Sequence, residues 1–303
     1  MQETPALSPR LRALYAGLGA TVIWASTFIF IKIALQDLGP LSIAGMRYFG
    51  GFLILLPFMR GSVRSLGRDL WWQMAWLGIS CYLVGNGAFF WSLKYLPAVT
   101  ASFMVGFLSI AMLIGGAIWL KEFPRPLQIV GTLICLFGSG LFFSPGIAAG
   151  ESVGYALAGI GLLGFIAFGL LGRSVARQQH VDTVILTALP LGLGGILTLV
   201  IALVVEGLPR FSLQSGLIVL WLAAVNTSLA YWLYTFALRT LTALEMNVLL
   251  NLSPLITAVL AWITIDERLS RIELVGMLVA LLGIGLVQYR KDADGAMDGP
   301  IKE

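Results

Sequence analysis

Residues 130–141 read VGTLICLFGSGL, and residues 275–286 repeat the pattern as VGMLVALLGIGL. The two stretches share seven identical residues at a constant shift of 145 positions. The same shift superimposes five further identical pairs, which are Leu93/Leu238, Leu96/Leu241, Ala98/Ala243, Ile118/Ile263 and Glu122/Glu267. Self-similarity at one fixed period indicates a chain built from two related halves, here residues 1–145 and residues 146–290.

Both stretches lie in long apolar runs, which are typical of helices that cross a lipid bilayer. Of the 303 residues, 58% are hydrophobic and 11% are charged, whereas a soluble domain carries about 25% charged residues. About 20 apolar residues cross the hydrocarbon as a helix, and lipid cannot satisfy an open backbone. We therefore predict an all-α membrane protein with ten transmembrane helices, at residues 12–34, 41–59, 71–93, 98–120, 127–144, 153–172, 183–205, 214–237, 243–264 and 272–289.

The basic residues of the loops are distributed unevenly between the two sides of the membrane. With ten spans, 13 Lys and Arg residues fall on the side of the N-terminus and 4 fall on the other side. The positive-inside rule then places both termini in the cytoplasm. Five spans per half make the second half enter the membrane the other way up, which is an inverted-topology repeat of the kind found in secondary transporters. Residues 291–303 are polar and acidic, and we predict a disordered cytoplasmic tail there.

Polar and aromatic residues gather inside a few spans, where Asn and Ser side chains need a partner helix or a wet cavity. Asn247 and Asn251 share one helix face, and the span at 214–237 also carries Asn226 and Thr227. Interhelical hydrogen bonding, or anchoring of the rings at the membrane interface, is the simpler explanation. The alternative is a substrate cavity lined by Trp24, Ser26, Thr27, Tyr82, Asn86, Phe90, Phe107, Tyr231, Tyr234, Asn247 and Asn251.

Two basic residues and two prolines lie within spans. Lys32 is near the end of the first span, and Arg47 is in the first turns of the second. Such side chains can snorkel toward the interface or bind a helix C-terminus. They can also contact a substrate carboxylate or gate the outer mouth of a cavity. Pro190 and Pro254 each remove a backbone hydrogen bond, which favours either a helix break at a transport site or a simple packing kink.

Groups that could relay protons are missing from the middle of the spans. No Asp or Glu lies deep in any predicted span, and the single histidine, His180, is in a loop. A buried ionisable residue is expensive in a membrane and is typical of proton-coupled carriers. We therefore predict facilitated movement down a substrate gradient, and no metal or cofactor. An enzyme is disfavoured, because the spans carry no His-Glu-x-x-His motif, no His to pair with a Ser and no Asp pair.

Short motifs in a fixed order give the chain a family resemblance. The first half carries Trp24, Ser26, Phe28, Leu38, Pro40 and Arg47 in that order. Both halves carry Leu-x-x-Leu-x-Ala, at residues 93–98 and 238–243, followed by a Glu and a Gly. The set resembles the drug/metabolite transporter superfamily, and specifically its EamA-type ten-helix carriers. The first copy departs from the pattern at Ser109 and Phe123, where the second copy has Pro254 and Arg268.

Within that superfamily the chain is similar to the YddG-type amino-acid exporters. The resemblance implies a basket-like bundle with a central cavity, with the fifth and tenth helices set to one side. It also implies export of aromatic and other neutral amino acids, for which we expect broad specificity. A carrier of another metabolite or drug with the same fold stays open, and so does a channel, although no charged ring or filter motif is present.

The expected surroundings of the protein follow from the same observations. We expect a multi-pass protein of the bacterial cytoplasmic (inner) membrane, with amino acids and the lipid bilayer as its partners. We expect a monomer that binds no nucleic acid, because the net charge of +4 arises from basic residues placed by topology.

Overall fold

The computed structural model describes residues 8–59, 67–108, 110–111, 114, 126–145, 150–176, 183–238, 240–241, 246 and 249–288. These residues are helical apart from short turns, and no strand occurs among them. The prediction of an all-α fold is therefore confirmed for these ranges. The tail predicted at residues 291–303 lies outside them.

The first half is described as seven helical segments and one helical turn. They are α1 (Pro9–Ala34), α2 (Pro40–Leu55) with a 3-10 turn (Leu56–Phe58), α3 (Arg68–Gly78), the π-helical segment η3 (Ile79–Gly87), α4 (Ala88–Ser92), α5 (Ala98–Gly106) and α7 (Pro126–Phe142). Proline stands at the first position of α1 and of α2, where its fixed φ suits a helix and its missing N–H is not needed.

The second half is described as seven helical segments. They are α8 (Glu151–Ala176), α9 (Thr183–Val205), α10 (Leu213–Ala223), the π-helical segment η4 (Ala224–Leu229), α11 (Ala230–Leu238), α13 (Ser253–Ile265) and α14 (Arg271–Gln288). Ser212 begins α10 with a reciprocal cap, in which Ser212 and Ser215 each accept from the other's backbone N–H. Each of the ten predicted spans coincides with helix over most of its described residues.

Helix length and exposed surface both fit a bilayer. Within the described ranges, five helical stretches are long and apolar enough to cross a membrane, and α7 and α13 are shorter apolar helices. Large apolar side chains cover the outside of the bundle, such as Leu163 at 65% and Ile263 at 70% exposure. A soluble protein rarely exposes so many large apolar residues together, whereas lipid solvates them.

The third and eighth predicted spans change their hydrogen-bond pattern midway, at equivalent positions of the repeat. The π-helical segments begin at Ile79 and at Ala224, which are 145 residues apart. Polar side chains reach carbonyls five residues earlier, over 2.8 Å from Asn86 to Cys81 and over 3.0 Å from Thr227 to Leu222. Both segments pack against α2. Such segments are frequent at functional sites, and the apolar pattern of the sequence did not indicate them.

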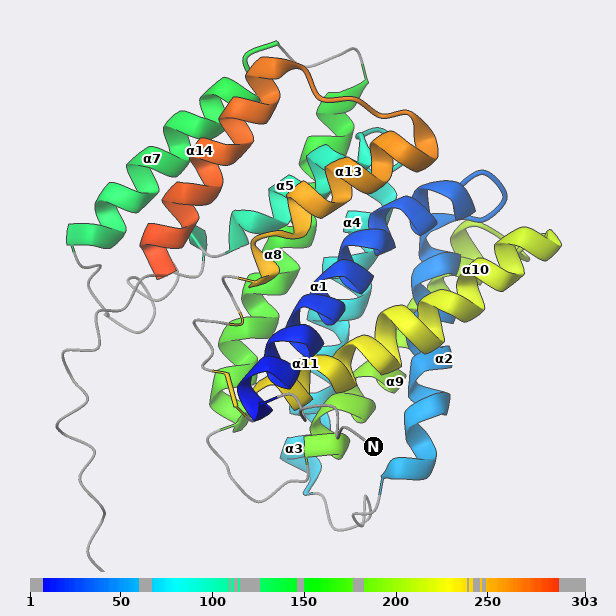
Figure 1. Cartoon of the computed structure of the whole chain (residues 1–303). Helices are drawn as coiled ribbons and strands as arrows, with labels where there is room; N and C mark the ends of the chain where they lie inside the picture. The colour runs from blue at the N-terminus through cyan, green and yellow to red at the C-terminus, as the bar shows by residue number, and fades with distance from the viewer. Residues whose placement is uncertain are drawn as a thin grey trace, which may run out of the picture.

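Helices of the two halves interleave, so that the core lies between the halves. Helix α1 crosses the bundle against α10, α11 and α13 of the second half, and α2 packs along α9 (Figure 1). The segments α3, η3 and α4 pack on α8 or α9. A movement of one half against the other must therefore change the contacts of the centre.

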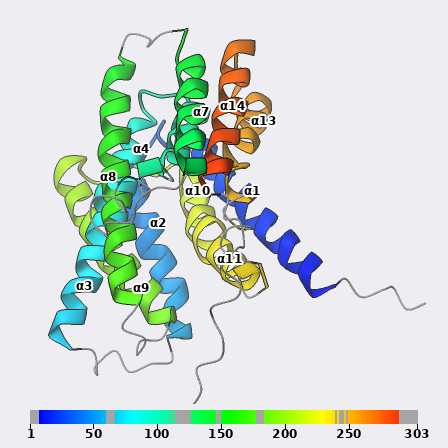
Figure 2. The ribbon, with the colours of Figure 1, turned by 90° about the vertical axis from the view of Figure 1, so that its left-hand side faces the viewer.

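Helices α7 and α14 form a separate pair at one edge of the bundle (Figures 1 and 2). Glycines allow the close approach, because a Cβ atom at Gly138 would lie 2.7 Å from the carbonyl oxygen of Gly276. Small residues at such contacts are typical of helix pairs in membranes. This is the placement that the family resemblance implied for the fifth and tenth helices.

The two prolines within predicted spans differ, because one lies inside a continuous helix and the other follows a helix break. Helix α9 is continuous through Pro190, so the break expected there is absent. Pro254 lies in the first turn of α13, after a turn at Asn251 and Leu252. Proline suits the first turn because the N–H groups there have no partner within the helix. The predicted ninth span is thus interrupted just before Pro254, and the two π-helical segments are further departures from regular α-helix.

Candidate functional site

The centre of the bundle holds a buried arginine. Arg47 lies about two turns into α2 and is 5% exposed. Its Nε donates to Oγ1 of Thr227 over 3.0 Å, and its Nη2 donates to the carbonyl oxygen of Asn226 over 3.1 Å. No carboxylate within the described ranges pairs with it. A buried charge without a counter-charge is costly, so its retention points to a role beyond packing.

Aromatic rings compensate part of that cost. The guanidinium carbon of Arg47 lies 5.1 Å from the ring centroid of Tyr48 and 5.6 Å from that of Phe90. The Tyr48 ring packs in turn on Tyr82, with 4.6 Å between the ring centroids. Ring faces attract a cation most strongly where water is excluded. The arginine therefore sits beside an aromatic wall built from α2, η3 and α4.

Asn226 connects η4 to α1 on the other side of the centre. Its Nδ2 donates to Oγ of Ser26 over 3.1 Å and to Oγ1 of Thr27 over 2.9 Å. The backbone carbonyl oxygen of Asn226 accepts from Nε1 of Trp24 over 3.1 Å. Asn226 is completely buried, and its Oδ1 has no hydrogen-bond partner within the described part of the chain. A buried acceptor without a donor is rare in folded proteins.

Trp24 completes the aromatic surroundings from α1. Its ring centroid lies 5.4 Å from that of Tyr231 and 5.4 Å from that of Tyr234. Tyr231 also interacts with Tyr82 of the first half. The structure thus gathers eight predicted residues around one centre, namely Trp24, Ser26, Thr27, Arg47, Tyr82, Phe90, Tyr231 and Tyr234.

Of the four other predicted cavity residues, three lie within the described ranges. The amide of Asn86 bonds to its own helix at Cys81. Phe107 lines a separate apolar pocket of about 400 Å³ with Met104, Phe143, Tyr155 and Leu162. Asn251 lies in the turn before α13, and Asn247 lies outside the described residues. One cavity lined by all eleven predicted residues is therefore not what the described structure shows.

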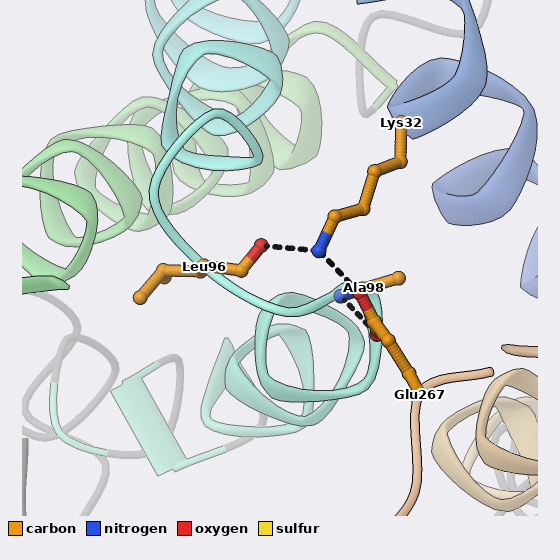
Figure 3. A network of polar contacts seen from close by, with 4 residues as sticks. All are labelled: Lys32, Leu96, Ala98 and Glu267. Atoms are coloured by element: carbon orange, nitrogen blue, oxygen red, sulfur yellow. Dashed lines mark hydrogen bonds and ion pairs between the residues drawn. The ribbon is translucent and has the colours of Figure 1, made fainter. Parts of the chain in front are cut away.

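Lys32 lies at the end of the bundle where α1 finishes, and not at the centre (Figure 3). Its ammonium pairs with the carboxylate of Glu267 and donates to the carbonyl oxygen of Leu96 over 3.2 Å. The other carboxylate oxygen of Glu267 accepts from the backbone N–H of Ala98 over 2.8 Å. The charge of Lys32 thus has a carboxylate partner, whereas none of the described carboxylates pairs with Arg47.

Tyr48 is the residue of this centre that the sequence analysis did not single out. It is 3% exposed and contacts Arg47, Tyr82 and Phe90. Its position directly after Arg47 was the available signal, but the side chains of consecutive helix residues point in different directions. Within the described ranges, no group of three or more His, Cys, Asp or Glu side chains could hold a metal ion.

Apolar helices with a lipid-like surface and a buried polar centre define a multi-pass membrane protein with an internal site. The sequence pattern of the EamA-like transporter family matches this chain twice, at residues 11–144 and at residues 153–289. The two matches cover most of the chain, which therefore belongs to the EamA-like transporter family and is a membrane transporter.

Relatives in distant organisms share nearly the full length. An uncharacterized transporter of Archaeoglobus fulgidus is 25% identical over 280 residues, which cover 89% of this chain and 95% of the relative. The uncharacterized inner membrane transporter YedA of Escherichia coli is 26% identical, covering 94% of this chain and 92% of YedA. The uncharacterized transporter YoaV of Bacillus subtilis is 20% identical, covering 88% of this chain and 93% of YoaV. These names support transport and leave the substrate open.

A solved crystal structure has the same fold. It superimposes with a TM-score of 0.65 at 16% sequence identity, covering 91% of this chain and 96% of that one. Similarity at this level of identity shows the fold alone, since one fold supports many functions.

Proposed function

We propose that this transporter exports amino acids, aromatic and other neutral ones, by alternating access to the central site. The observation that carries the proposal is the buried guanidinium of Arg47, which faces aromatic rings and has no carboxylate partner within the described ranges. Its Nη1 makes no hydrogen bond to any described residue. A substrate carboxylate would supply the missing counter-charge.

The chemistry of the site suits a zwitterion with an apolar side chain. Arginine binds a carboxylate through two parallel hydrogen bonds, which fixes the orientation of the bound group. The open Oδ1 of Asn226 is an acceptor for a substrate ammonium once the helices separate. Rings of Trp24, Tyr48 and Tyr231 offer apolar faces to the substrate side chain. Such faces discriminate weakly between similar side chains, at about 1–3 kcal/mol per methylene, so the specificity is broad.

Alternating access follows from the position of the site between the halves. In our proposal the halves form an inverted repeat with five spans each, both termini lie in the cytoplasm, and the tail is cytoplasmic. Rocking one half against the other would then expose the centre to each side in turn. The bacterial inner membrane is the proposed location, and the name of the relative YedA supports it. We propose that a monomer carries out the cycle without nucleic acid or cofactor.

The absence of buried acids supports a facilitative mechanism. No Asp or Glu is among the fully buried residues of the described ranges, and Arg47 is the charged residue found there. Flux then follows the amino-acid gradient, which favours export from a cell that overproduces the substrate.

A second candidate function is a carrier of apolar compounds. The pocket of about 400 Å³ around Phe107 is lined by apolar and aromatic side chains. Its volume lies within the range of sites for drug-sized ligands. The central Arg47 would have no evident task in this alternative, which is why we place it second.

Counterflow into proteoliposomes tests the proposal. Liposomes loaded with phenylalanine should take up labelled phenylalanine and threonine, with and without a pH gradient. Phenylalaninol, which has an alcohol in place of the carboxylate, should compete poorly. Failure of every amino acid to exchange would refute the proposed substrate class. Equal competition by phenylalaninol would refute the role of Arg47, and uptake only with a pH gradient would refute the facilitative mechanism.

A further inference from the structure

Polar contacts between the two halves gather at the end of the bundle where α1 finishes and α2 begins. Lys32 of the first half pairs with Glu267 of the second. Asp37 accepts a hydrogen bond from the hydroxyl of Ser212, and Glu206 contacts Ser42. The charge distribution of the loops predicts that this end faces the outside of the cell. We define these contacts together as the outer latch.

Two carboxylates of the outer latch cap helices of the opposite half. Glu206 accepts from the N–H groups of Leu41 and Ser42, each over 2.9 Å, at the beginning of α2. Glu267 accepts from the N–H of Ala98 over 2.8 Å at the beginning of α5. Neither helix has a side-chain cap at its own N-cap residue, Gly39 or Pro97. A helix N-terminus needs acceptors and attracts negative charge, so each glutamate stabilises a helix that it does not belong to.

Local geometry places Glu267 for this task. Asp266 ends α13 in the left-handed conformation, with φ of 53°, and turns the chain back toward the bundle. The N–H of Glu267 then donates to the carbonyl of Ala261 over 3.2 Å, which fixes the turn. The Glu267 carboxylate meets both the Lys32 ammonium and the Ala98 N–H (Figure 3). One side chain thus holds the ends of α1 and α5 to the end of α13.

The residues next to the outer latch in the sequence are tightly buried. Ile31, Ile43 and Ala101 are completely buried, each in the first turns beneath the latch. Leu41, which Glu206 caps, is six residues from Arg47 on the same helix, or about 9 Å along the axis. Access from this end therefore requires α2 and α5 to move away from the loops that carry Glu206 and Glu267.

From these contacts we infer that Glu267 is the gating residue of the outer latch. Its carboxylate holds the outer side closed through Lys32 and the N-terminus of α5, and it must release both partners before the central site can open outward. Neutralising Glu267 shifts the protein toward the outward-open form. The inference rests on the transporter fold and not on the identity of the substrate.

The native Cys81 reports on this opening. It is 6% exposed, lies in η3 and belongs to the same buried cluster as Tyr48, Tyr82 and Phe90 of the centre. The other cysteine, Cys135, lies in α7 and is replaced by Ala in the parent protein of the experiment. A membrane-impermeant thiol reagent is applied to right-side-out vesicles and to inside-out vesicles, and the rate of Cys81 modification is measured from each side.

Glu267→Gln should raise the rate of Cys81 modification from outside roughly tenfold, because it weakens a cap and removes an ion pair. The rate from the cytoplasmic side should fall. Glu273→Gln is the matched control, since Glu273 caps only its own helix through the N–H of Ser270 over 2.7 Å. Lys32→Met removes the ion pair and keeps the cap, so it should give a smaller increase.

Two results would overturn the inference. One is an equal rate of Cys81 modification from outside in the Glu267→Gln variant and in the Glu273→Gln control. The other is an equal increase from both sides, which would indicate general loosening of the bundle. If Glu267→Gln does not fold, Lys32→Met decides, and an unchanged rate from outside in that variant overturns the inference. The readout needs no substrate, so failed amino-acid exchange would refute the proposed function and leave the latch intact.

Discussion

The outer latch and the central site each contain one basic side chain, and the two side chains differ in exposure and in their partners. Lys32 has a carboxylate partner, and its side chain is 31% exposed. Arg47 is 5% exposed and has two hydrogen bonds and two aromatic rings, but no carboxylate in the described ranges. Among the described residues, the first charge has a carboxylate partner and the second does not.

This difference assigns separate roles to Lys32 and Arg47, for which the sequence allowed either substrate binding or gating. A partly exposed ion pair contributes little stability, so the pair at Lys32 can break and form during a cycle. A buried arginine that lacks a carboxylate partner among the described residues is stabilised strongly by an incoming anion, because a low dielectric strengthens the attraction. Lys32 therefore suits a gate, and Arg47 suits substrate recognition.

Arg47→Met should have the largest effect on transport. Loss of a buried partner of a carboxylate costs about 2–5 kcal/mol, so phenylalanine counterflow should fall by roughly 100-fold or more. Arg47→Lys keeps the charge without the planar fork and should retain part of the rate. The initial rate in proteoliposomes measures both. Arg210→Met, at an exposed loop residue, is the control, and full transport by Arg47→Met would contradict the assignment.

Asn226→Ala should have the next largest effect, through stability as well as transport. It leaves buried hydroxyls of α1 without their donor, which costs about 1–2 kcal/mol and lowers the melting temperature in detergent. Transport should also fall, because η4 would no longer be held against α1. Asn86→Ala loses a bond within its own helix and should lower the melting temperature less. Equal melting temperatures of the two variants would count against a linking role of Asn226.

Lys32→Met tests whether the basic residue of the outer latch also binds the substrate. Because Lys32 is not at the centre, phenylalanine counterflow should change by less than roughly tenfold, in line with the low value of a partly exposed ion pair. The apparent affinity should be affected less than the rate, since gating and not binding is altered. A loss as large as that of Arg47→Met would show that both cations serve the substrate.

Gly39→Ala should have the smallest effect. A Cβ atom at Gly39 would overlap the Glu206 carboxylate, which would then move away from the beginning of α2. Loss of one cap costs about 1 kcal/mol, so outside modification of Cys81 should rise a few-fold. Gly67→Ala is the matched control, because a Cβ atom there would meet no atom within 4 Å. If Cys81 is modified from outside at the same rate in both variants, Glu206 is not part of the latch.

The family and the helical architecture could be predicted because they depend on local properties. Apolar runs of membrane-spanning length require helices. The similarity of residues 130–141 to residues 275–286 can be read from the sequence alone. Family membership and the helical segments are confirmed. The orientation in the membrane and the inverted relation of the halves stay predictions.

The candidate site could be predicted only in part. A rule that selects polar and aromatic residues inside spans found Trp24, Tyr82 and Tyr231, which meet at the centre. The same rule selected Phe107, which lines a separate pocket, and Asn86, whose amide bonds to Cys81 of its own helix. Position along a span does not determine which neighbour a side chain meets, and a π-helical segment rotates every residue after it relative to a regular helix.

The sequence by itself determined that this protein is a helical membrane transporter in two related halves, since hydropathy and repeat period are properties of the chain alone. Only the tertiary structure decided which of two basic side chains meets a carboxylate among the described residues. Lys32 and Arg47 look alike in the sequence, but Glu267 lies 235 residues from Lys32 and reaches it only through the turn at Asp266. Arg47 meets Thr227 and Asn226 because η4 packs against α2. Long-range packing brings such partners together, and the distance between them along the chain carries no signal of it.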